Sequence, residues 1–161
     1  MIRAFTMIEL VFVIVVIGIL TGIAMPKFAA TRDDATITKA KTTLSSIRSA
    51  ITQEAQRRQM AGDYTPIFSL SLTHNSYNRT IFDYFDNNNT GPRVLEYPIK
   101  SCDDSNSVGC WKMSRKGSAN QKEQYRYVFP QAVKSGYVNY ELQSNRFVCI
   151  DTNDKCDILE H

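Results

Sequence analysis

The chain begins with a run that is apolar on all sides. Residues 5–25 carry a single charged side chain, Glu9. At about 1.5 Å of rise per residue, a helix of this length reaches roughly 30 Å, which is close to the hydrocarbon thickness of a bilayer. The pattern predicts a membrane-spanning helix with one acid near its start.

Helical periodicity continues beyond the apolar run, but with one apolar side only. Apolar residues recur at steps of three or four among Thr, Ser, Lys, Arg and Gln, at Ile37, Ala40, Leu44, Ile47, Ile51 and Ala55. Gly62 is a stop signal. We therefore predict one helix of about 55 residues, roughly 80 Å long. Pro26 removes a helical hydrogen bond and is expected to bend it near the membrane surface.

After residue 62 the pattern changes to turns and short strands. The Asn-, Asp- and Pro-rich stretch 63–92 predicts irregular chain, with room for a short helix over 80–85. Strand-like segments follow at 94–99, 125–129, 136–142 and 146–149. This order predicts an α+β fold in which a small antiparallel sheet lies against the exposed half of the long helix.

Charge and cysteine content limit the class of protein. The formal net charge of +3 is too small either to demand or to exclude nucleic acid. The four cysteines lack zinc-site spacing, and their even number indicates an oxidising compartment. Three pairings are open, of which we favour the local one, Cys102–Cys110 and Cys149–Cys156. Free buried thiols are the alternative.

Glu9 is the most informative residue, because an ionised side chain at the centre of a membrane helix costs roughly 2.5–3.5 kcal/mol. It therefore needs a partner, unless it lies at the interfacial edge and reaches water. Gly18 and Gly22 form a G-x-x-x-G spacing. That spacing suits close contact between helices, and it is equally typical of a generic weak point in a helix.

The residues around Glu9 resemble a known processing site. They are Arg3-Ala4-Phe5-Thr6-Met7-Ile8-Glu9-Leu10, followed by the apolar helix. The run closely resembles the class III signal peptides of type IV pilins and of the pseudopilins of type II secretion and DNA-uptake systems. The match covers roughly residues 1–35, with Phe5 as first mature residue, Glu9 as fifth and Pro26 as twenty-second. Ala4 replaces the usual glycine, and because alanine is small we still expect cleavage.

The resemblance implies a domain organisation and a life cycle. Residues 1–4 would be a leader, 5–25 the transmembrane and assembly helix, 26–61 its amphipathic continuation, and 62–161 a C-terminal globular pilin-like domain. A prepilin peptidase would cut between Ala4 and Phe5 and methylate the new amino group of Phe5. The precursor would span the cytoplasmic membrane once, with its C-terminal domain outside the cytoplasm.

Assembly follows from the same resemblance. Homologous subunits would stack through their N-terminal helices into a periplasmic pseudopilus or a surface pilus, driven by an inner-membrane platform and a cytoplasmic ATPase. The assembly residues would be Glu9, Gly18, Gly22 and Pro26. The system served (adhesion or motility, protein secretion or DNA uptake) and the choice between major and minor subunit stay open.

Elementary electrostatics gives Glu9 a partner in this scheme. Cleavage creates a cation at Phe5, and opposite charges 4 Å apart attract by about 4 kcal/mol at an effective dielectric constant near 20, less the cost of desolvation. Residues 5 and 9 are one helical turn apart, so the pair could form within one chain. The resemblance instead implies a pair between neighbouring subunits.

Two weaker patterns lie in the C-terminal domain. Oxygen ligands of the kind that calcium prefers gather at Asp151, Asn153, Asp154 and Asp157, although an ordinary acidic turn is the favoured interpretation. Aromatic and basic residues interleave over 111–146, which allows nucleic-acid binding. We favour a solvated strand face with core tyrosines there. No cofactor is required, and because no catalytic motif is present we do not expect an enzyme.

Two rival interpretations remain open. Gly22-Ile23-Ala24 could serve as the cleavage site of an ordinary secretory signal, giving a periplasmic protein that starts at Met25. A plain membrane anchor carrying a binding domain that never polymerises would keep Met1. A methylated Phe5 start would identify a pilin-like subunit, so N-terminal sequencing separates the three.

Overall fold

The computed structural model describes residues 6–72, 77–118, 121–131, 133–151 and 154–160, with the backbone alone for 25–30. Its order of elements is α1 (Met7–Met60), β1 (Thr80–Ile81), a 3-10 turn η1 (Phe85–Asn87), β2 (Ile99–Lys100), β3 (Cys110–Arg115), β4 (Gln124–Val128), β5 (Tyr137–Gln143), β6 (Arg146–Cys149) and α2 (Lys155–Glu160). The fold is α+β, as predicted.

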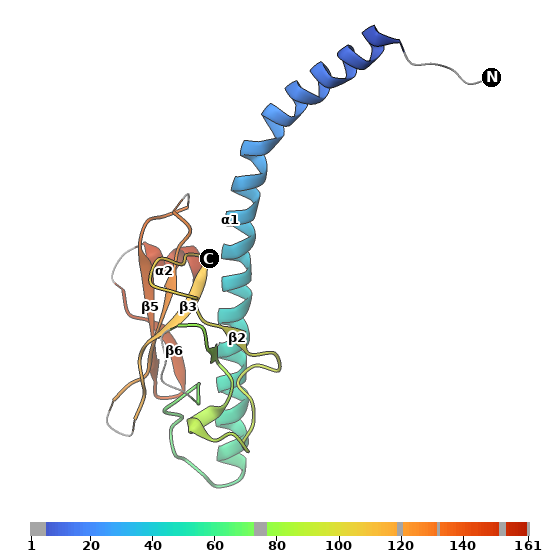
Figure 1. Ribbon diagram of the computed structural model, residues 1–161. Coiled ribbons are helices and arrows are strands. Elements are labelled where there is room, and N and C mark those ends of the chain that lie inside the picture. Colours follow the sequence, from blue (N-terminus) through green and yellow to red (C-terminus); the bar gives the residue numbers. More distant parts are fainter. Residues whose placement is uncertain (1–5, 73–76, 119–120, 132, 152–153, 161) are drawn as a thin grey trace, which may run out of the picture.

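Helix α1 is continuous over 54 residues and dominates the shape of the molecule. It curves away from the domain, so that its N-terminal half projects free (Figure 1). Its C-terminus is closed by Gly62, whose positive φ of 78° allows the chain to reverse. There the Gly62 N–H donates to the Gln59 carbonyl and the Asp63 N–H to the Arg58 carbonyl, which is the Schellman motif.

The main sheet is an antiparallel meander in the order β3-β4-β5-β6. Its inner face lies against the C-terminal half of α1 (Figure 1). The buried residues of that face are Trp111, Met113, Tyr125, Tyr127, Val138, Tyr140, Leu142 and Phe147. Ser144 and Asn145 both have positive φ and form the tight turn between β5 and β6.

Two predicted elements are wrong. No helix covers 80–85, because Thr80 and Ile81 pair with β2 and only the short η1 follows. Residues 94–98 form no strand, and Ile99 is the first residue of β2. The Val94 and Leu95 N–H groups donate to the carbonyls of Asp83 and Phe82, so this segment bonds to irregular chain. Pro98 also lacks the N–H that a sheet ladder needs. Strand β3 and helix α2 were not predicted.

A segment with no strand partner, Ile67–Leu72, crosses the domain; we name it the strap. Each of its backbone N–H groups ends on a side-chain oxygen, at distances of 2.7 to 3.4 Å. The acceptors, in chain order, are Asn145 Oδ1, Asp86 Oδ1 for two donors, Glu123 Oε1, Ser69 Oγ and Asp83 Oδ1.

Glu123 is the most deeply buried carboxylate among these acceptors, with a side chain that is fully covered. Besides Leu70 N–H, its carboxylate accepts from Ser69 Oγ, Tyr125 Oη and Gly117 N–H. Burial raises the pKa of Glu123, and these hydrogen bonds oppose the shift only in part. Gly117 permits the close approach, since a Cβ there would stand 2.1 Å from the Phe68 carbonyl oxygen.

Candidate functional site

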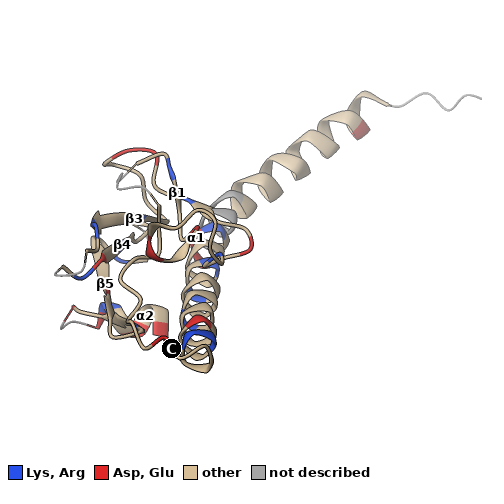
Figure 2. Cartoon of the chain, turned by 90° about the horizontal axis from the view of Figure 1, so that it is seen from below, with Lys and Arg blue, Asp and Glu red and all other residues tan. Residues whose placement is uncertain are grey.

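The N-terminal half of α1 has no packing partner within the described chain. Met7–Ala24 has a mean hydropathy of 2.7 and none of it is buried, so it is long and apolar enough to cross a membrane. The exposed fraction of its large side chains runs from 37% at Val16 to 84% at Met7. Figure 2 shows charged residues on the domain and on the C-terminal half of α1, whereas this half carries one acid at its start.

The start of α1 is capped by Thr6. Thr6 has an extended backbone, with φ −80° and ψ 150°, and its Oγ1 accepts a hydrogen bond from the Glu9 N–H at 3.3 Å. Glu9 is therefore the third residue of the helix, where the helix dipole favours an anion by typically 0.3–1 kcal/mol. The acid lies at the end of the apolar span and not at its centre.

Thr6 is a residue that the sequence analysis missed. The signal was present, because a threonine three residues before a glutamate, ahead of an apolar run, is the capping-box pattern. The observed hydrogen bond uses the backbone N–H of Glu9, so it does not require the carboxylate. Any capping by the side chain and any role of its charge separate experimentally, because glutamine can serve in the capping box and has no charge.

The predicted processing residues, Ala4 and Phe5, lie outside the described residues. The described helix begins at Met7, so the pairing of residue 5 with Glu9, within one chain or between chains, stays a prediction.

Gly18 and Gly22 lie on the exposed apolar half. A Cβ added at either glycine would meet no atom within 4 Å, so no contact inside the chain requires them. Thr21, between them, donates its hydroxyl to the Ile17 carbonyl at 2.7 Å and so has its donor satisfied without water. Pro26, the fourth predicted assembly residue, is part of the continuous helical backbone.

The C-terminal half of α1 is fixed to the domain by apolar and ionic contacts. The apolar contact consists of Ile37, Ala40, Leu44, Ile47 and Ile51, which are all buried. At its end, Glu54 accepts from the guanidinium groups of Arg57 and Arg58, and Arg58 also pairs with Asp86 at 2.5 Å. Burial alone would raise the pKa of Glu54, but the two arginines outweigh it and lower the pKa.

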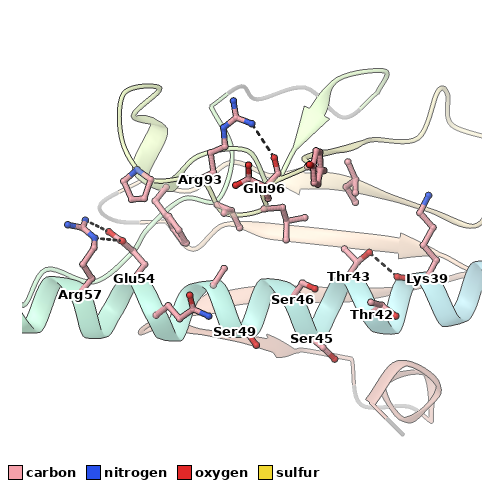
Figure 3. Close-up of a pocket in the computed structure, with 18 residues that line it drawn as sticks. Lys39, Thr42, Thr43, Ser45, Ser46, Ser49, Glu54, Arg57, Arg93 and Glu96 are labelled. Carbon is pink, nitrogen blue, oxygen red and sulfur yellow. Dashed lines mark hydrogen bonds and ion pairs between the residues drawn. The ribbon is translucent and has the colours of Figure 1, made fainter.

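A groove of about 840 Å³ runs between α1 and the segment from Pro92 to Tyr97 (Figure 3). The residues that line its helix side include Thr42, Thr43, Ser45, Ser46 and Ser49. The hydroxyls of Thr42 and Thr43 donate to the helix carbonyls of Thr38 and Lys39. On the opposite wall, Arg93 donates to the Glu96 carbonyl at 3.2 Å. None of the described residues that line it is His or Cys.

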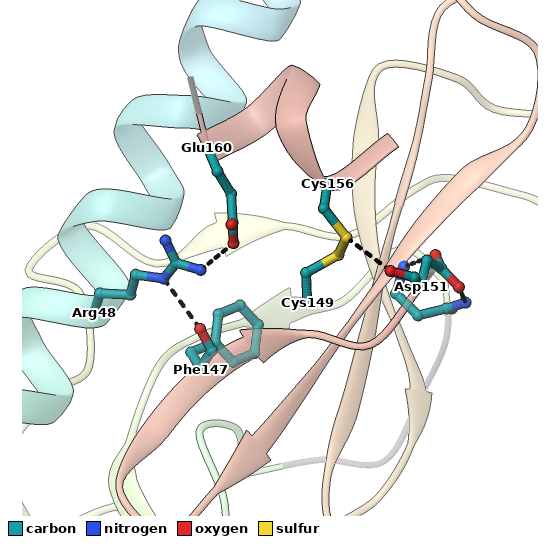
Figure 4. Close-up of a disulfide and its surroundings, with 7 residues drawn as sticks. Arg48, Phe147, Cys149, Asp151, Cys156 and Glu160 are labelled. Atoms are coloured by element: carbon teal, nitrogen blue, oxygen red, sulfur yellow. Dashed lines mark hydrogen bonds and ion pairs between the residues drawn. A yellow bond between two sulfur atoms is a disulfide. The ribbon is translucent and has the colours of Figure 1, made fainter. Parts of the chain in front are cut away.

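Both disulfides are present in the favoured local pairing. Cys149–Cys156 joins β6 to α2, with the Cα atoms 6.0 Å apart, and Cys102–Cys110 ties the chain after β2 to β3 at 5.3 Å. Arg48 of α1 donates to the Phe147 carbonyl at 3.0 Å and pairs with Glu160 of α2 (Figure 4). The Cys149–Cys156 disulfide and Arg48 together hold the C-terminal end of the described chain against α1.

The three candidate calcium ligands that are described, Asp151, Asp154 and Asp157, do not form a metal-binding group. The Asp151 carboxylate accepts from the backbone and side-chain nitrogens of Asn139, while Asp154 and Asp157 are exposed. Asn153 lies outside the described residues. Across the described ranges, no three His, Cys, Asp or Glu side chains form a group that could hold a metal ion.

The interleaved aromatic and basic residues divide between two faces. Trp111, Tyr125 and Tyr127 are core residues and cannot stack on bases. Arg115 and Lys122 pair with Glu141. Tyr137 remains exposed on the outer face of the sheet, with the Arg126 guanidinium 3.7 Å from its ring centroid.

Comparison with known proteins adds no relative. No protein-family model matches the chain, no curated protein matches its sequence, and no solved structure matches its fold. A functional proposal therefore rests on the residues of this chain.

Proposed function

We propose that this chain is a structural subunit of a type IV pilin-like or pseudopilin-like filament, processed between Ala4 and Phe5 and polymerised through α1. The observation that carries the proposal is the division of one continuous helix into an exposed apolar half and a half fixed to a disulfide-bonded domain. The proposal assigns no catalytic reaction to the chain.

The apolar half needs a partner in every environment. Lipid covers it before assembly, and other copies of the same half cover it in a filament. Moving a helix from lipid to a helix bundle gives little hydrophobic gain, so association depends on close packing and on polar pairs. The exposed Gly18 and Gly22 suit close packing, and Glu9 is the polar group.

Glu9 gives the filament its register in this scheme. The new amino group of Phe5 on one subunit pairs with Glu9 of its neighbour, at an attraction of about 4 kcal/mol before desolvation. A pair of this kind fixes the axial position of each subunit, which apolar packing alone specifies poorly.

The decisive variant is Glu9→Gln, because it keeps a capping-box side chain and removes the charge. We expect the variant to insert into the membrane and to fold, but to form few or no filaments. The measurement is the filament yield in sheared surface and periplasmic fractions, with electron microscopy, at matched protein levels. Glu96→Gln, the same change at an exposed acid of the domain, is the control and should assemble normally.

Normal filaments from Glu9→Gln would show that the charge is not used. Failure of Glu9→Val together with success of Glu9→Gln would assign Glu9 to capping alone. Mass spectrometry of the N-terminus tests processing separately. A methylated Phe5 supports the proposal, whereas a retained Met1 supports the alternative of a membrane-anchored binding domain that does not polymerise.

Deletion phenotypes then assign the system. Loss of protein secretion, of adhesion or motility, or of DNA uptake would each identify one class of filament. Abundance in the isolated filaments would distinguish a major from a minor subunit.

A further inference from the structure

Two Asn-x-Thr triplets occur in the chain, Asn78-Arg79-Thr80 and Asn88-Asn89-Thr90. This triplet, with any residue but proline in the middle, is the acceptor sequence for N-linked glycosylation of exported proteins. The structure treats the two triplets differently.

The Asn88 triplet is exposed, and its Asn and Thr side chains are hydrogen-bonded to each other. Its Oδ1 accepts from the backbone N–H of Thr90 at 3.1 Å and from the Thr90 hydroxyl at 2.8 Å. The side-chain nitrogen, Nδ2, donates no hydrogen bond to any described residue. The two side chains that define the acceptor are therefore already in contact, while the nitrogen that would be modified is available.

Among the described residues, the backbone of Asn88 itself makes local turn hydrogen bonds. Gly91 N–H donates to the Asn88 carbonyl, and Asn88 N–H donates to the Phe85 carbonyl, both at 3.0 Å. Asn88, Asn89 and Thr90 are all exposed. This loop can enter the binding site of another protein without loss of any strand pairing.

The backbone around Asn78 is tied into the fold. Its own N–H donates to the Cys102 carbonyl at 2.8 Å, and Arg79 N–H donates to Ser101 Oγ at 3.1 Å. Thr80 pairs with Lys100 in the β1–β2 ladder. Cys102 is held in turn by its disulfide to Cys110. Asn78, Arg79 and Thr80 are exposed as well, so the two triplets differ in their backbone pairing: extending Asn78 into an enzyme site would break these hydrogen bonds.

We infer that Asn88 is an acceptor for N-linked glycosylation in the folded protein and that Asn78 is not. The co-substrate is an oligosaccharide joined to a membrane lipid through a diphosphate. A bond forms between Asn88 Nδ2 and C1 of the first sugar as the bond from C1 to the diphosphate oxygen breaks. The lipid diphosphate leaves with the bonding electrons, and the amide proton passes to a base of the transferase.

The position of the loop suits such a modification. Asp86, two residues before Asn88, pairs with Arg58 near the C-terminal end of α1. The loop therefore lies far from the exposed apolar half of the helix (Figure 1). A glycan there leaves the apolar surface uncovered. The biological use of the site rests on the outward placement of the domain in the proposed function.

The test uses the folded, disulfide-bonded full chain in detergent micelles. A purified single-subunit oligosaccharyltransferase that reads Asn-x-Thr is supplied with a lipid-diphosphate-linked oligosaccharide, and intact mass and peptide mapping give the sites. We expect one glycan per chain, on Asn88. Asn88→Gln and Thr90→Val should each abolish the mass shift, whereas Asn78→Gln should leave it unchanged.

Two short synthetic peptides, one for each triplet, separate the effect of sequence from that of fold. We expect the enzyme to modify both peptides, but only Asn88 in the folded chain. No transfer to the folded chain, transfer to Asn78 as efficient as to Asn88, or failure to modify the Asn88 peptide would each overturn the inference. Because the readout uses unassembled chains, it is independent of filament formation and so of the proposed function.

Discussion

The two halves of α1 belong to one helix but differ in where their side chains find partners. In the C-terminal half, Leu44, Ile47 and Ile51 are at most 1% exposed. In the N-terminal half, Ile14, Ile17 and Leu20 are 55 to 61% exposed, although they are no less apolar. Contacts within one chain therefore explain the apolar residues of the C-terminal half, but they do not explain those of the N-terminal half.

This difference shows which residues can stabilise the domain and, under the proposed function, which would act in assembly. A buried isoleucine contributes to the free energy of unfolding of the domain, whereas an exposed one can contribute only when lipid or another chain covers it. Equivalent substitutions in the two halves should therefore give opposite phenotypes.

The largest effect is expected from Ile47→Ala. Removal of a fully buried isoleucine side chain leaves a cavity and typically costs about 2–5 kcal/mol. The measurement is urea unfolding of the domain, followed by tryptophan fluorescence from Trp111, with the full chain in detergent.

Ile14→Ala is the matched control, since Ile14 is 58% exposed. It should leave the unfolding curve of the domain unchanged. An equal loss of stability from both variants would contradict the division of the helix. Filament yield should show the opposite pattern: Ile14→Ala should lower the yield although the chain is fully folded.

A smaller effect is expected at the ionic end of the C-terminal half. The pKa of Glu54 is lowered in the folded protein from an ordinary value of 4.5, so its contribution to stability is present above pH 4.5 and is lost as pH falls through the lower folded value. Glu54→Gln should cost about 1–3 kcal/mol at neutral pH, because it leaves the partly buried Arg58 without this partner.

The pH dependence distinguishes Glu54 from Glu123. The pKa of Glu123 is raised by burial, so its contribution to stability falls as pH rises above 4.5. The quantity to measure is therefore the difference in free energy of unfolding between wild type and Glu54→Gln, from pH 3 to pH 7. That difference should shrink on acidification. A difference that is constant with pH would show that the Glu54 charge is not involved.

The smallest effect is expected at the start of the N-terminal half. Thr6→Ala removes the capping oxygen and should cost about 1 kcal/mol of local helix stability. Faster amide hydrogen exchange over the first turn of α1 in micelles would show it. Thr6→Ser should behave as wild type, and Thr21→Ala, which alters a hydroxyl elsewhere in the same half, should not affect the first turn.

The sequence was most informative where the determining pattern is local. Periodicity located α1 to within a residue of its C-terminus, and alternation located β4, β5 and β6 to within one or two residues. Spacing alone favoured the two disulfides that are present. The apolar half and its single acid could likewise be read directly from the chain.

The sequence was least informative where the partner is remote. Val94 and Leu95 look like a strand, but their N–H groups bond to Asp83 and Phe82 in irregular chain. The strap has no periodicity, because its conformation depends on acceptors as distant as Asn145, 78 residues from Ile67. The same limit holds for the candidate site, since the partners of Glu9, Gly18 and Gly22 would belong to other molecules.

The strap has a consequence for the order in which the domain folds. Its N–H groups bond to Asp83, Asp86, Glu123 and Asn145, and to its own Ser69. Most of these acceptors come after it in the chain, so it cannot become ordered until β4 and the β5–β6 turn have formed. Residues 67–72 should therefore be among the last to gain protection from hydrogen exchange during refolding, after the sheet beside them.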